Sequence, residues 1–363
     1  MFLSIIIPTY NSEKTIIPLL DSIKKSRGVD LREMEVVIVD DYSKDETIKK
    51  ITRFVNPKQG PTLRLIVLKE NAGPAHARNV GVKHAYGRVV LFLDSDVVLY
   101  RESLFEVIRS FKEDPDLYAL TGVWDKKQKS RKFFPKFKAL RDWSYWINER
   151  DPRNYYYLFS TRVAAIDRKL FLRLGGFDET YKAALVEDIE LTYRIARRYA
   201  VVFNPKVKVA HEFEDFWVVA KKYFWRSFYW SKIYRERKKF DPVATTGKEA
   251  VTTISAGMLV ILVISYIGIR FTIYDLGFKN ELISLLEFLN LTSLFLILFI
   301  HLYGVRKFLW FAGKEEGIIF AIKSFFTGIA LYLMILAGAV MSLIISNVKC
   351  QNSKLQLKTV NLN

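Results

Sequence analysis

The sequence predicts an α/β domain with a mostly parallel, doubly wound sheet, followed by an interfacial helix and an all-α transmembrane domain. Three observations lead to this prediction. Short apolar runs alternate with helical stretches over the first hundred residues, which is typical of consecutive β-α-β units. An aromatic and basic stretch follows at residues 216–240, and residues 251–346 then hold three apolar segments. Each segment has the length of about 20 residues that a helix needs to cross a bilayer.

Four apolar runs are the predicted strands, and their near-continuous apolar character is expected of strands buried on both faces. They lie at residues 3–7, 35–39, 63–68 and 88–93. Helices are predicted at about 14–25, 44–54, 74–84 and 101–111. In sheets of this kind, ligands bind beyond the carboxyl ends of the strands. The polar residues at those ends are Asn11, Asp40, Asp41, Asn71, Asp94, Ser95 and Asp96.

The composition divides the chain into four parts, with predicted boundaries 1–215, 216–250, 251–346 and 347–363. The first is the α/β domain, the second an amphipathic interfacial helix with a linker, the third a domain of three transmembrane helices, and the last a tail. The second part interleaves aromatic rings with Lys and Arg, which suits the lipid headgroup layer. The alternative is a helix docked on the first domain with its charges in water.

The transmembrane helices are predicted at about 251–269, 282–303 and 324–345. Lys and Arg gather before the first of them and between the second and third. By the positive-inside rule, the α/β domain is then cytoplasmic and the C-terminus lies outside, in a multi-pass protein of the cell membrane. Glu287 and His301 lie in or near the second span, where ionisable groups are functional candidates. The alternative is that both lie near the ends of the span and reach water.

The net charge of +18 admits nucleic acid, an anionic membrane surface or a phosphate-rich ligand as a partner. The cations cluster at 126–153 and 221–248, among aromatic residues and directly before the first apolar segment. This position favours the membrane, and no nucleic acid partner is expected. Cys350 is the only cysteine, which excludes an internal disulfide and a cysteine-based zinc site. The oligomeric state does not follow from the sequence.

The most informative local pattern is Asp94-Ser95-Asp96, which directly follows an apolar strand. Hard divalent cations such as Mn²⁺ or Mg²⁺ bind oxygen ligands, commonly one or two carboxylates together with phosphate oxygens. We therefore predict Asp96 as a direct metal ligand. Asp94 is predicted as a second ligand, or as the partner of a ribose or a metal-bound water. The alternative is an ordinary turn, where Asp and Ser are common.

Five further motifs accompany this triplet along the chain. They lie at residues 4–11, 37–47, 70–81, 175–179 and 186–191. In order and spacing, the six motifs resemble those of the inverting family-2 glycosyltransferases, which have the GT-A fold. The resemblance covers about residues 1–240, and its motifs are weak singly but specific together.

The resemblance implies a nucleotide-sugar donor at the strand ends. The implied donor-binding residues are Pro8, Thr9, Tyr10, Asn11, Asp41, Asn71, Gly73, Arg78, Asp94, Ser95 and Arg226. The first four belong to the loop that holds the nucleotide, and Asp41 is expected to accept an N–H of the base. Gly73 would let the backbone pass close to the nucleotide, while Arg78 would pair with the diphosphate or brace the donor loop. Alternatively, Asp40 or Asp41 caps the next helix.

The resemblance also implies the catalytic groups. Asp188 is expected to be the general base that deprotonates the acceptor hydroxyl, and Glu187 is expected to orient the site. The alternative for both is a favourable charge at a helix N-terminus. His211 follows a predicted strand at a place where some relatives bind a metal through histidine; the alternative is a structural histidine. A divalent metal, Mn²⁺ or Mg²⁺, is the implied cofactor.

These expectations describe transfer of one sugar from a GDP- or UDP-sugar to a polyisoprenyl (dolichyl) phosphate or a lipid-linked glycan. The sugar is expected to be a hexose, with GDP-mannose the first donor to consider. Processive relatives carry Gln-x-x-Arg-Trp on a helix near the membrane, whereas this chain has Tyr223-Phe224-Trp225-Arg226-Ser227 and keeps only the arginine. A short-chain processive polysaccharide synthase is therefore an alternative, as is a catalytically idle scaffold that binds nucleotide.

Overall fold

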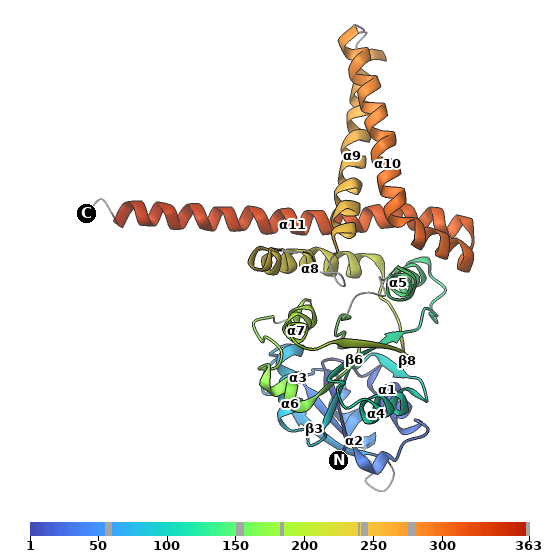
Figure 1. Cartoon of the computed structure of the whole chain (residues 1–363), viewed down its shortest axis with the longest axis vertical. Coiled ribbons are helices and arrows are strands. Elements are labelled where there is room, and N and C mark those ends of the chain that lie inside the picture. Colours follow the sequence, from blue (N-terminus) through green and yellow to red (C-terminus); the bar gives the residue numbers. More distant parts are fainter. Residues whose placement is uncertain are drawn as a thin grey trace. The chain divides into compact units, whose positions relative to one another are not determined.

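The chain forms two compact units, Met1–Glu214 and Asp215–Asn363, in the computed structural model shown in Figure 1. The structure describes residues 1–54, 60–149, 156–181, 185–238, 240, 246–274 and 281–360, with side chains in the last helix as far as Ser346. The last three residues of the predicted tail, 361–363, lie outside the described residues.

The first unit is built on an eight-stranded sheet with the order β3-β2-β1-β4-β7-β6-β8-β5. The strands are β1 (Leu3–Thr9), β2 (Met34–Asp40), β3 (Thr62–Val67), β4 (Val89–Leu93), β5 (Val97–Leu99), β6 (Ala119–Trp124), β7 (Val163–Asp167) and β8 (Val201–His211). The four strands predicted from the apolar runs are β1 to β4, and they pair in parallel. The seven residues of β1 are all buried, as the apolar run predicted.

The helices of this unit pack around the sheet and keep the predicted alternation. They are α1 (Ile16–Lys24), α2 (Thr47–Phe54), α3 (Pro74–Lys83), α4 (Ser103–Glu113), α5 (Phe133–Ser144), α6 (Arg168–Arg173) and α7 (Glu187–Ile195), with short helical turns at Leu31–Glu33 and Tyr145–Glu149. Helix α2 begins three residues later than predicted because residues 44–46 belong to the preceding loop. Asp45 accepts the backbone N–H of Thr47 at 3.0 Å, so the alternative that Asp40 or Asp41 caps this helix is wrong.

The second half of the sheet is mixed rather than parallel. β7 runs antiparallel to β4 and β6, and β5 runs antiparallel to β8. The pairing of β6 with β8 is parallel but shifts in register between Thr121 and Val123. At that point a Cβ on Gly122 would lie 2.2 Å from the Val207 carbonyl oxygen, and Pro205 has no N–H to donate to the ladder. The two strands approach closely and bend there.

This bend is required by the connection from β4 to β5. The two strands lie four places apart in the sheet order, but only Asp94, Ser95 and Asp96 separate them in sequence. Four places in a flat sheet correspond to about 19 Å, whereas four residue steps reach at most about 14 Å. The sheet must therefore curl so that β5 and the end of β8 come back toward the carboxyl end of β4.

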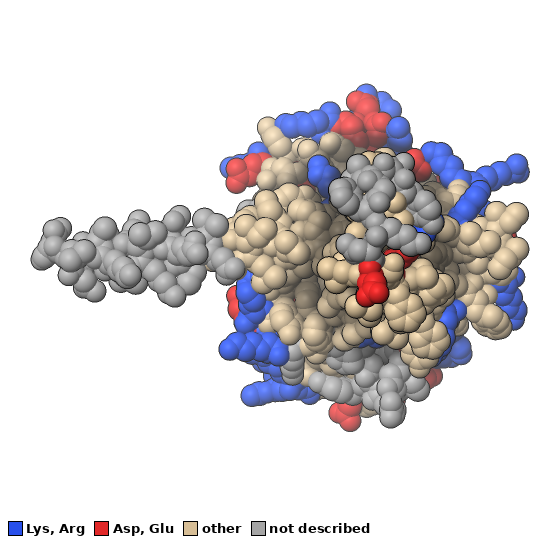
Figure 2. Space-filling view, turned by 90° about the horizontal axis from the view of Figure 1, so that it is seen from above, with Lys and Arg blue, Asp and Glu red and all other residues tan. Residues whose placement is uncertain are grey.

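The second unit is helical, with α8 (Phe216–Arg237), α9 (Gly247–Tyr274), α10 (Glu281–Glu316) and α11 (Ile318–Val360). Among the described residues, three segments are long and apolar enough to cross a membrane: Gly247–Ile273, Glu281–Glu316 and Ile318–Ser346. Figure 2 shows these helices from above, and most of their visible surface carries no Lys, Arg, Asp or Glu. The predicted all-helical C-terminal part with three long apolar segments is thus confirmed.

Candidate active site

Two loops at the carboxyl ends of β1 and β2 are joined by reciprocal hydrogen bonds. The Asn11 amide donates to the Ser43 hydroxyl at 2.9 Å, and the Asn11 side-chain oxygen accepts the Lys44 N–H at 2.8 Å. Asn11 and Tyr42 both have positive φ, 50° and 69°, a strained conformation for residues with a Cβ. The side chain of Asn11, predicted to hold a nucleotide, therefore holds the neighbouring loop, which fixes the shape of this sheet edge.

The other predicted residues of these loops divide into buried and exposed groups. Pro8 and Thr9 are buried within β1, and the Thr9 hydroxyl donates to Asp40 at 3.2 Å. Tyr10 has 49% of its surface exposed. Of the four residues, Tyr10 thus presents its ring at the edge where a ligand would bind.

Asp41 organises the loop between β3 and α3. Its two carboxylate oxygens accept the N–H groups of Ala72 and Gly73 at 2.8 and 2.9 Å. Gly73 has φ of +92°, which favours glycine, and Pro74 is the first residue of α3. Asn71 lies exposed in the same loop. Asp41 therefore fixes the backbone of the loop before α3.

Arg78 links the end of β4 to the start of α7. Its guanidinium contacts Asp94 at 2.8 Å and Glu187 at 3.0 Å, and only 2% of the Arg78 side chain is exposed. Burial lowers the pKa of Arg78, but the two carboxylates outweigh it, so the pKa is raised and the charge is kept. Arg78 joins the Asp-Ser-Asp turn to the Glu-Asp pair, a contact that sequence reasoning did not foresee.

Asp188 lies at the first turn of α7 beside this cluster. Glu187 is buried and also accepts the Leu185 N–H at 2.8 Å, while Asp188 is half-buried and accepts the Ile189 N–H at 2.8 Å. Both carboxylates also meet the N-terminus of a helix, where negative charge is favourable. The helix start thus places one carboxylate inward against Arg78 and the next nearer the surface.

Asp96 and His211 form the other end of the site. The His211 Nε2 lies 3.3 Å from the Asp96 Oδ2, and His211 is the last residue of β8, paired with Val97 of β5. Partial desolvation by neighbouring protein atoms raises the pKa of Asp96, whose side chain is still 49% exposed, but the bond from His211 and the charge of Arg162 outweigh this and lower the pKa overall. The curl of the sheet brings together two side chains that are more than a hundred residues apart.

The Asp96–His211 pair fits a divalent cation. Two ligand atoms that each lie about 2.1 Å from an ion, with a right angle between the two bonds, are about 3 Å apart. The 3.3 Å between the His211 Nε2 and the Asp96 Oδ2 is close to this separation. The imidazole Nδ1 is buried without a hydrogen-bond partner, so the described residues lack the acceptor that usually orients a metal-binding histidine through its second nitrogen. No group of three or more metal-binding side chains occurs among the described residues, and Asp94 is held by Arg78. An ion here would need further ligands from water or phosphate.

Two residues that sequence reasoning missed surround this pair. Gln128 donates to the His211 carbonyl at 2.8 Å and accepts the Phe213 N–H at 2.9 Å, so it fixes the backbone on both sides of Glu212. Arg162 lies with its guanidinium 4.6 Å from the ring centre of Trp124 and 5.4 Å from that of Phe213. Leu93 pairs with Val163 in antiparallel register, so Arg162, directly before β7, lies at the same end of the sheet as Asp94, directly after β4. In the described part of the chain, Arg162 forms no ion pair.

The Gly175-Gly176-Phe177-Asp178-Glu179 motif is attached to α3. Asn79 donates to the Phe177 carbonyl at 2.9 Å and accepts the Phe177 N–H at 2.9 Å. His76 contacts Glu179 at 2.8 Å. The motif is therefore fixed to α3, the helix that also carries Arg78.

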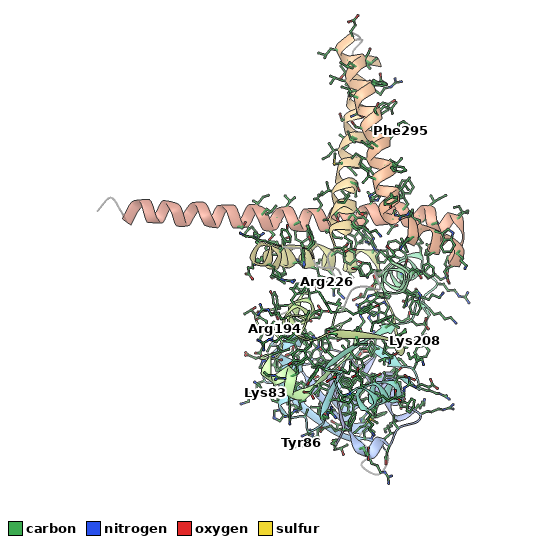
Figure 3. All side chains as sticks on the ribbon, viewed as in Figure 1. Lys83, Tyr86, Arg194, Lys208, Arg226 and Phe295 are labelled. Carbon is green, nitrogen blue, oxygen red and sulfur yellow. The ribbon has the colours of Figure 1, made fainter. Side chains whose placement is uncertain are left out.

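Arg226 belongs to the second unit, on α8. Its Nε is buried without a hydrogen-bond partner, and Figure 3 labels its position on the helix. Its contact with a donor diphosphate stays a prediction.

Residues 4–175 match the model of glycosyl transferase family 2. Together with the fold, this match supports glycosyltransferase family 2 for the first unit, and with it a transferase. A solved structure of similar fold is the mannosyltransferase PcManGT from Pyrobaculum calidifontis, in complex with GDP-Man and Mn²⁺. It has a TM-score of 0.56 and 19% identity, over 94% of this chain and 86% of that chain. The predicted GT-A fold class is confirmed.

Two curated relatives match shorter stretches. Poly(ribitol-phosphate) beta-N-acetylglucosaminyltransferase TarS of Staphylococcus aureus (strain Mu50) is 43% identical over 105 residues, which are 29% of this chain and 18% of TarS. Poly-beta-1,6-N-acetyl-D-glucosamine synthase of Staphylococcus epidermidis is 32% identical over 120 residues, 33% of this chain and 28% of the synthase. The chain therefore matches less than a third of the length of each relative.

Proposed function

We propose that this chain is a membrane-bound inverting glycosyltransferase that moves one sugar from a GDP- or UDP-sugar to a lipid-linked acceptor. The observation that carries the proposal is one connected site. His211 contacts Asp96, Asp96 and Asp94 share one turn, and Arg78 joins Asp94 to Glu187, next to Asp188. One end suits a cation with a diphosphate, and the other end suits removal of a proton from a hydroxyl.

The donor end is built from cations and metal ligands. Mn²⁺ or Mg²⁺ held by Asp96 and His211 would offset the charge that grows on the leaving diphosphate. Arg162 beside Asp96 suits a phosphate oxygen, because a guanidinium matches phosphate geometry. The exposed ring of Tyr10 suits contact with the nucleobase. GDP-mannose is the first donor to test, and UDP-sugars follow.

The acceptor end rests on Asp188. Its carboxylate takes the proton of the acceptor hydroxyl, whose oxygen attacks the anomeric carbon opposite the leaving diphosphate. One displacement of this kind inverts the configuration. The Arg78 guanidinium lies 3.0 Å from Glu187 and holds this buried carboxylate in place beside the base. A polyisoprenyl (dolichyl) phosphate is already ionised and needs no base, so Asp188 favours a lipid-linked glycan as the acceptor.

The full chain, purified in detergent with Mn²⁺, tests this function with radiolabelled donors and either a polyisoprenyl phosphate or a lipid-linked glycan. We expect one labelled sugar on the lipid, and a rate that falls roughly 10²–10⁴-fold in Asp188→Asn when the acceptor is a hydroxyl. Nucleotide binding should persist in this variant. Asp116→Asn, an exposed aspartate in a turn before β6, is the matched control.

The outcomes separate the alternatives. Absence of labelled lipid with every donor would overturn the proposal in favour of an idle scaffold, and a product of several sugars would favour the short-chain processive synthase. Full activity of Asp188→Asn on both acceptors would show that Asp188 is not the general base.

A further inference from the structure

Helices α9 and α10 form a hairpin that is apolar on its outside. They lie side by side in Figure 1. Near one end Ser255 contacts His301 at 2.9 Å, and near the other Arg270 contacts Glu287 at 2.9 Å. Phe295 points away from the pair with 64% of its surface exposed (Figure 3). Between these two polar contacts the hairpin presents apolar side chains, as a membrane-spanning pair must.

Helix α11 has a different setting. It crosses the end of the hairpin instead of running along it, and α8 lies beside it on the side away from the hairpin (Figure 1). The contact with α8 is close: a Cβ on Gly338 would lie 2.1 Å from the Phe224 carbonyl oxygen. Ser227 donates to the Ile335 carbonyl at 2.7 Å, and Arg235 contacts Ser342 at 3.2 Å.

The charge of α8 determines what α11 can do. The contacts with α8 fall at residues 335–342, inside the apolar segment Ile318–Ser346. The basic residues of α8 are Lys221, Lys222, Arg226, Lys232, Arg235 and Arg237. If α11 crossed the bilayer with α8 against it, these side chains would be carried toward the hydrocarbon, where Lys and Arg are costly. At the membrane surface the same cations meet lipid headgroups.

We propose that, among the described helices, only the α9–α10 hairpin crosses the bilayer, while α11 lies along the membrane surface with α8. The lipid surface is the partner of the α8–α11 pair. Leu331, Tyr332 and Ser342 of α11 are buried among the helices, whereas Ile319, Phe326 and Ile344 are exposed and would enter the boundary between headgroups and acyl chains.

The distribution of charge agrees with this arrangement. With three spans, the tail that holds Lys349, Lys354 and Lys358, and no acidic residue after Glu316, would lie outside. With one hairpin, these lysines lie on the same side as the basic residues of α8, as the positive-inside rule favours. The C-terminus then faces the same side as the first unit, which differs from the topology predicted from three spans.

Cys350, the only cysteine of the chain, tests the topology in the full-length protein. A membrane-impermeant maleimide is applied to intact spheroplasts and to inside-out vesicles of a bacterial expression host. Two cysteine-free reference variants, Cys350→Ser with Lys112→Cys on α4 or with Glu281→Cys at the start of α10, report the first unit and the far end of the hairpin. We expect Cys350 to react at least tenfold faster from the side that labels Lys112→Cys, and Glu281→Cys from the opposite side.

Labelling of Cys350 from the side opposite to Lys112→Cys would show that α11 crosses the bilayer and would overturn the proposal. Labelling of all three positions from one side would overturn it as well, because the hairpin would then not cross. If Cys350 stays unreactive after detergent is added, Asn363→Cys in the Cys350→Ser background takes its place. Sugar transfer is not measured here, so this result is independent of the proposed function.

Discussion

Replacement of Arg78 by methionine tests whether its buried guanidinium holds the site together. The two carboxylates it pairs with, Asp94 and Glu187, lie 2.8 and 3.0 Å away, and Glu187 is 3% exposed in its side chain. Removal of one partner from a buried ion pair costs about 3–5 kcal/mol, because a charge is left without compensation. For a unit of 214 residues, that loss lowers the melting temperature by roughly 6–20 °C.

The assay is thermal unfolding of the full chain in detergent, followed by near-UV circular dichroism. Arg32→Met is the matched control, because Arg32 contacts Asp30 at 2.8 Å but the two side chains are 87% and 43% exposed. An exposed pair contributes about 0–1 kcal/mol, so the control should melt within a few degrees of the wild type. Equal melting temperatures for Arg78→Met and Arg32→Met would refute the reasoning that burial makes the Arg78 pairs essential.

Three further predictions concern the residues around the site. Gly176→Ala should lower the free energy of unfolding by about 1–3 kcal/mol, because Gly176 has φ of +72° and the new Cβ would lie 2.5 Å from the Asn79 Oδ1. The control Gly175→Ala has φ of +84° but open space around the new Cβ, so it should have a higher melting temperature than Gly176→Ala. Burial raises the pKa of Glu179 but bonds from Asn79 and His76 lower it overall, so its stabilisation is present above the unfolded pKa near 4.3 and is lost as pH falls through the folded pKa. Melting temperatures between pH 7 and 3 should therefore fall less steeply in Glu179→Gln than in the wild type, and parallel curves would contradict this. Gln128→Ala should weaken Mn²⁺ binding roughly 10–100-fold, because Gln128 fixes the backbone of His211. Electron paramagnetic resonance measures this affinity, and an unchanged value would show that Gln128 does not support the metal site.

The elements that local pattern defines could be predicted from the sequence. The buried strands β1, β2 and β4 are continuous apolar runs, and their polar ends carry Asp41 and Asp94. The start of α7 could be predicted because Glu187 and Asp188 favour a helix N-terminus. These signals lie within a few residues of one another, so one chain segment contains all the information needed.

Contacts that depend on register could not be predicted in this way. The resemblance implies that Arg78 pairs with the diphosphate or braces the donor loop, but nothing near it in sequence shows that Asp94 and Glu187 lie on either side. Arg162 reaches the site because Leu93 pairs with Val163, a register that the antiparallel half of the sheet sets. The packing of α8 on α11 likewise depends on a small residue, Gly338, whose partner is far away in sequence.

The curl of the sheet has a consequence for the order in which the site forms during synthesis. Asp96 is synthesised early, whereas its partner His211 is the last residue of the last strand, β8. The contact between them joins residues far apart in sequence, and such contacts form slowly. Gly247, the first residue of α9, is made later still. The first unit can therefore form the contact between Asp96 and His211 before translation of the α9–α10 hairpin is complete. A ligand that binds the closed pair would stabilise the folded unit by mass action, independently of membrane insertion.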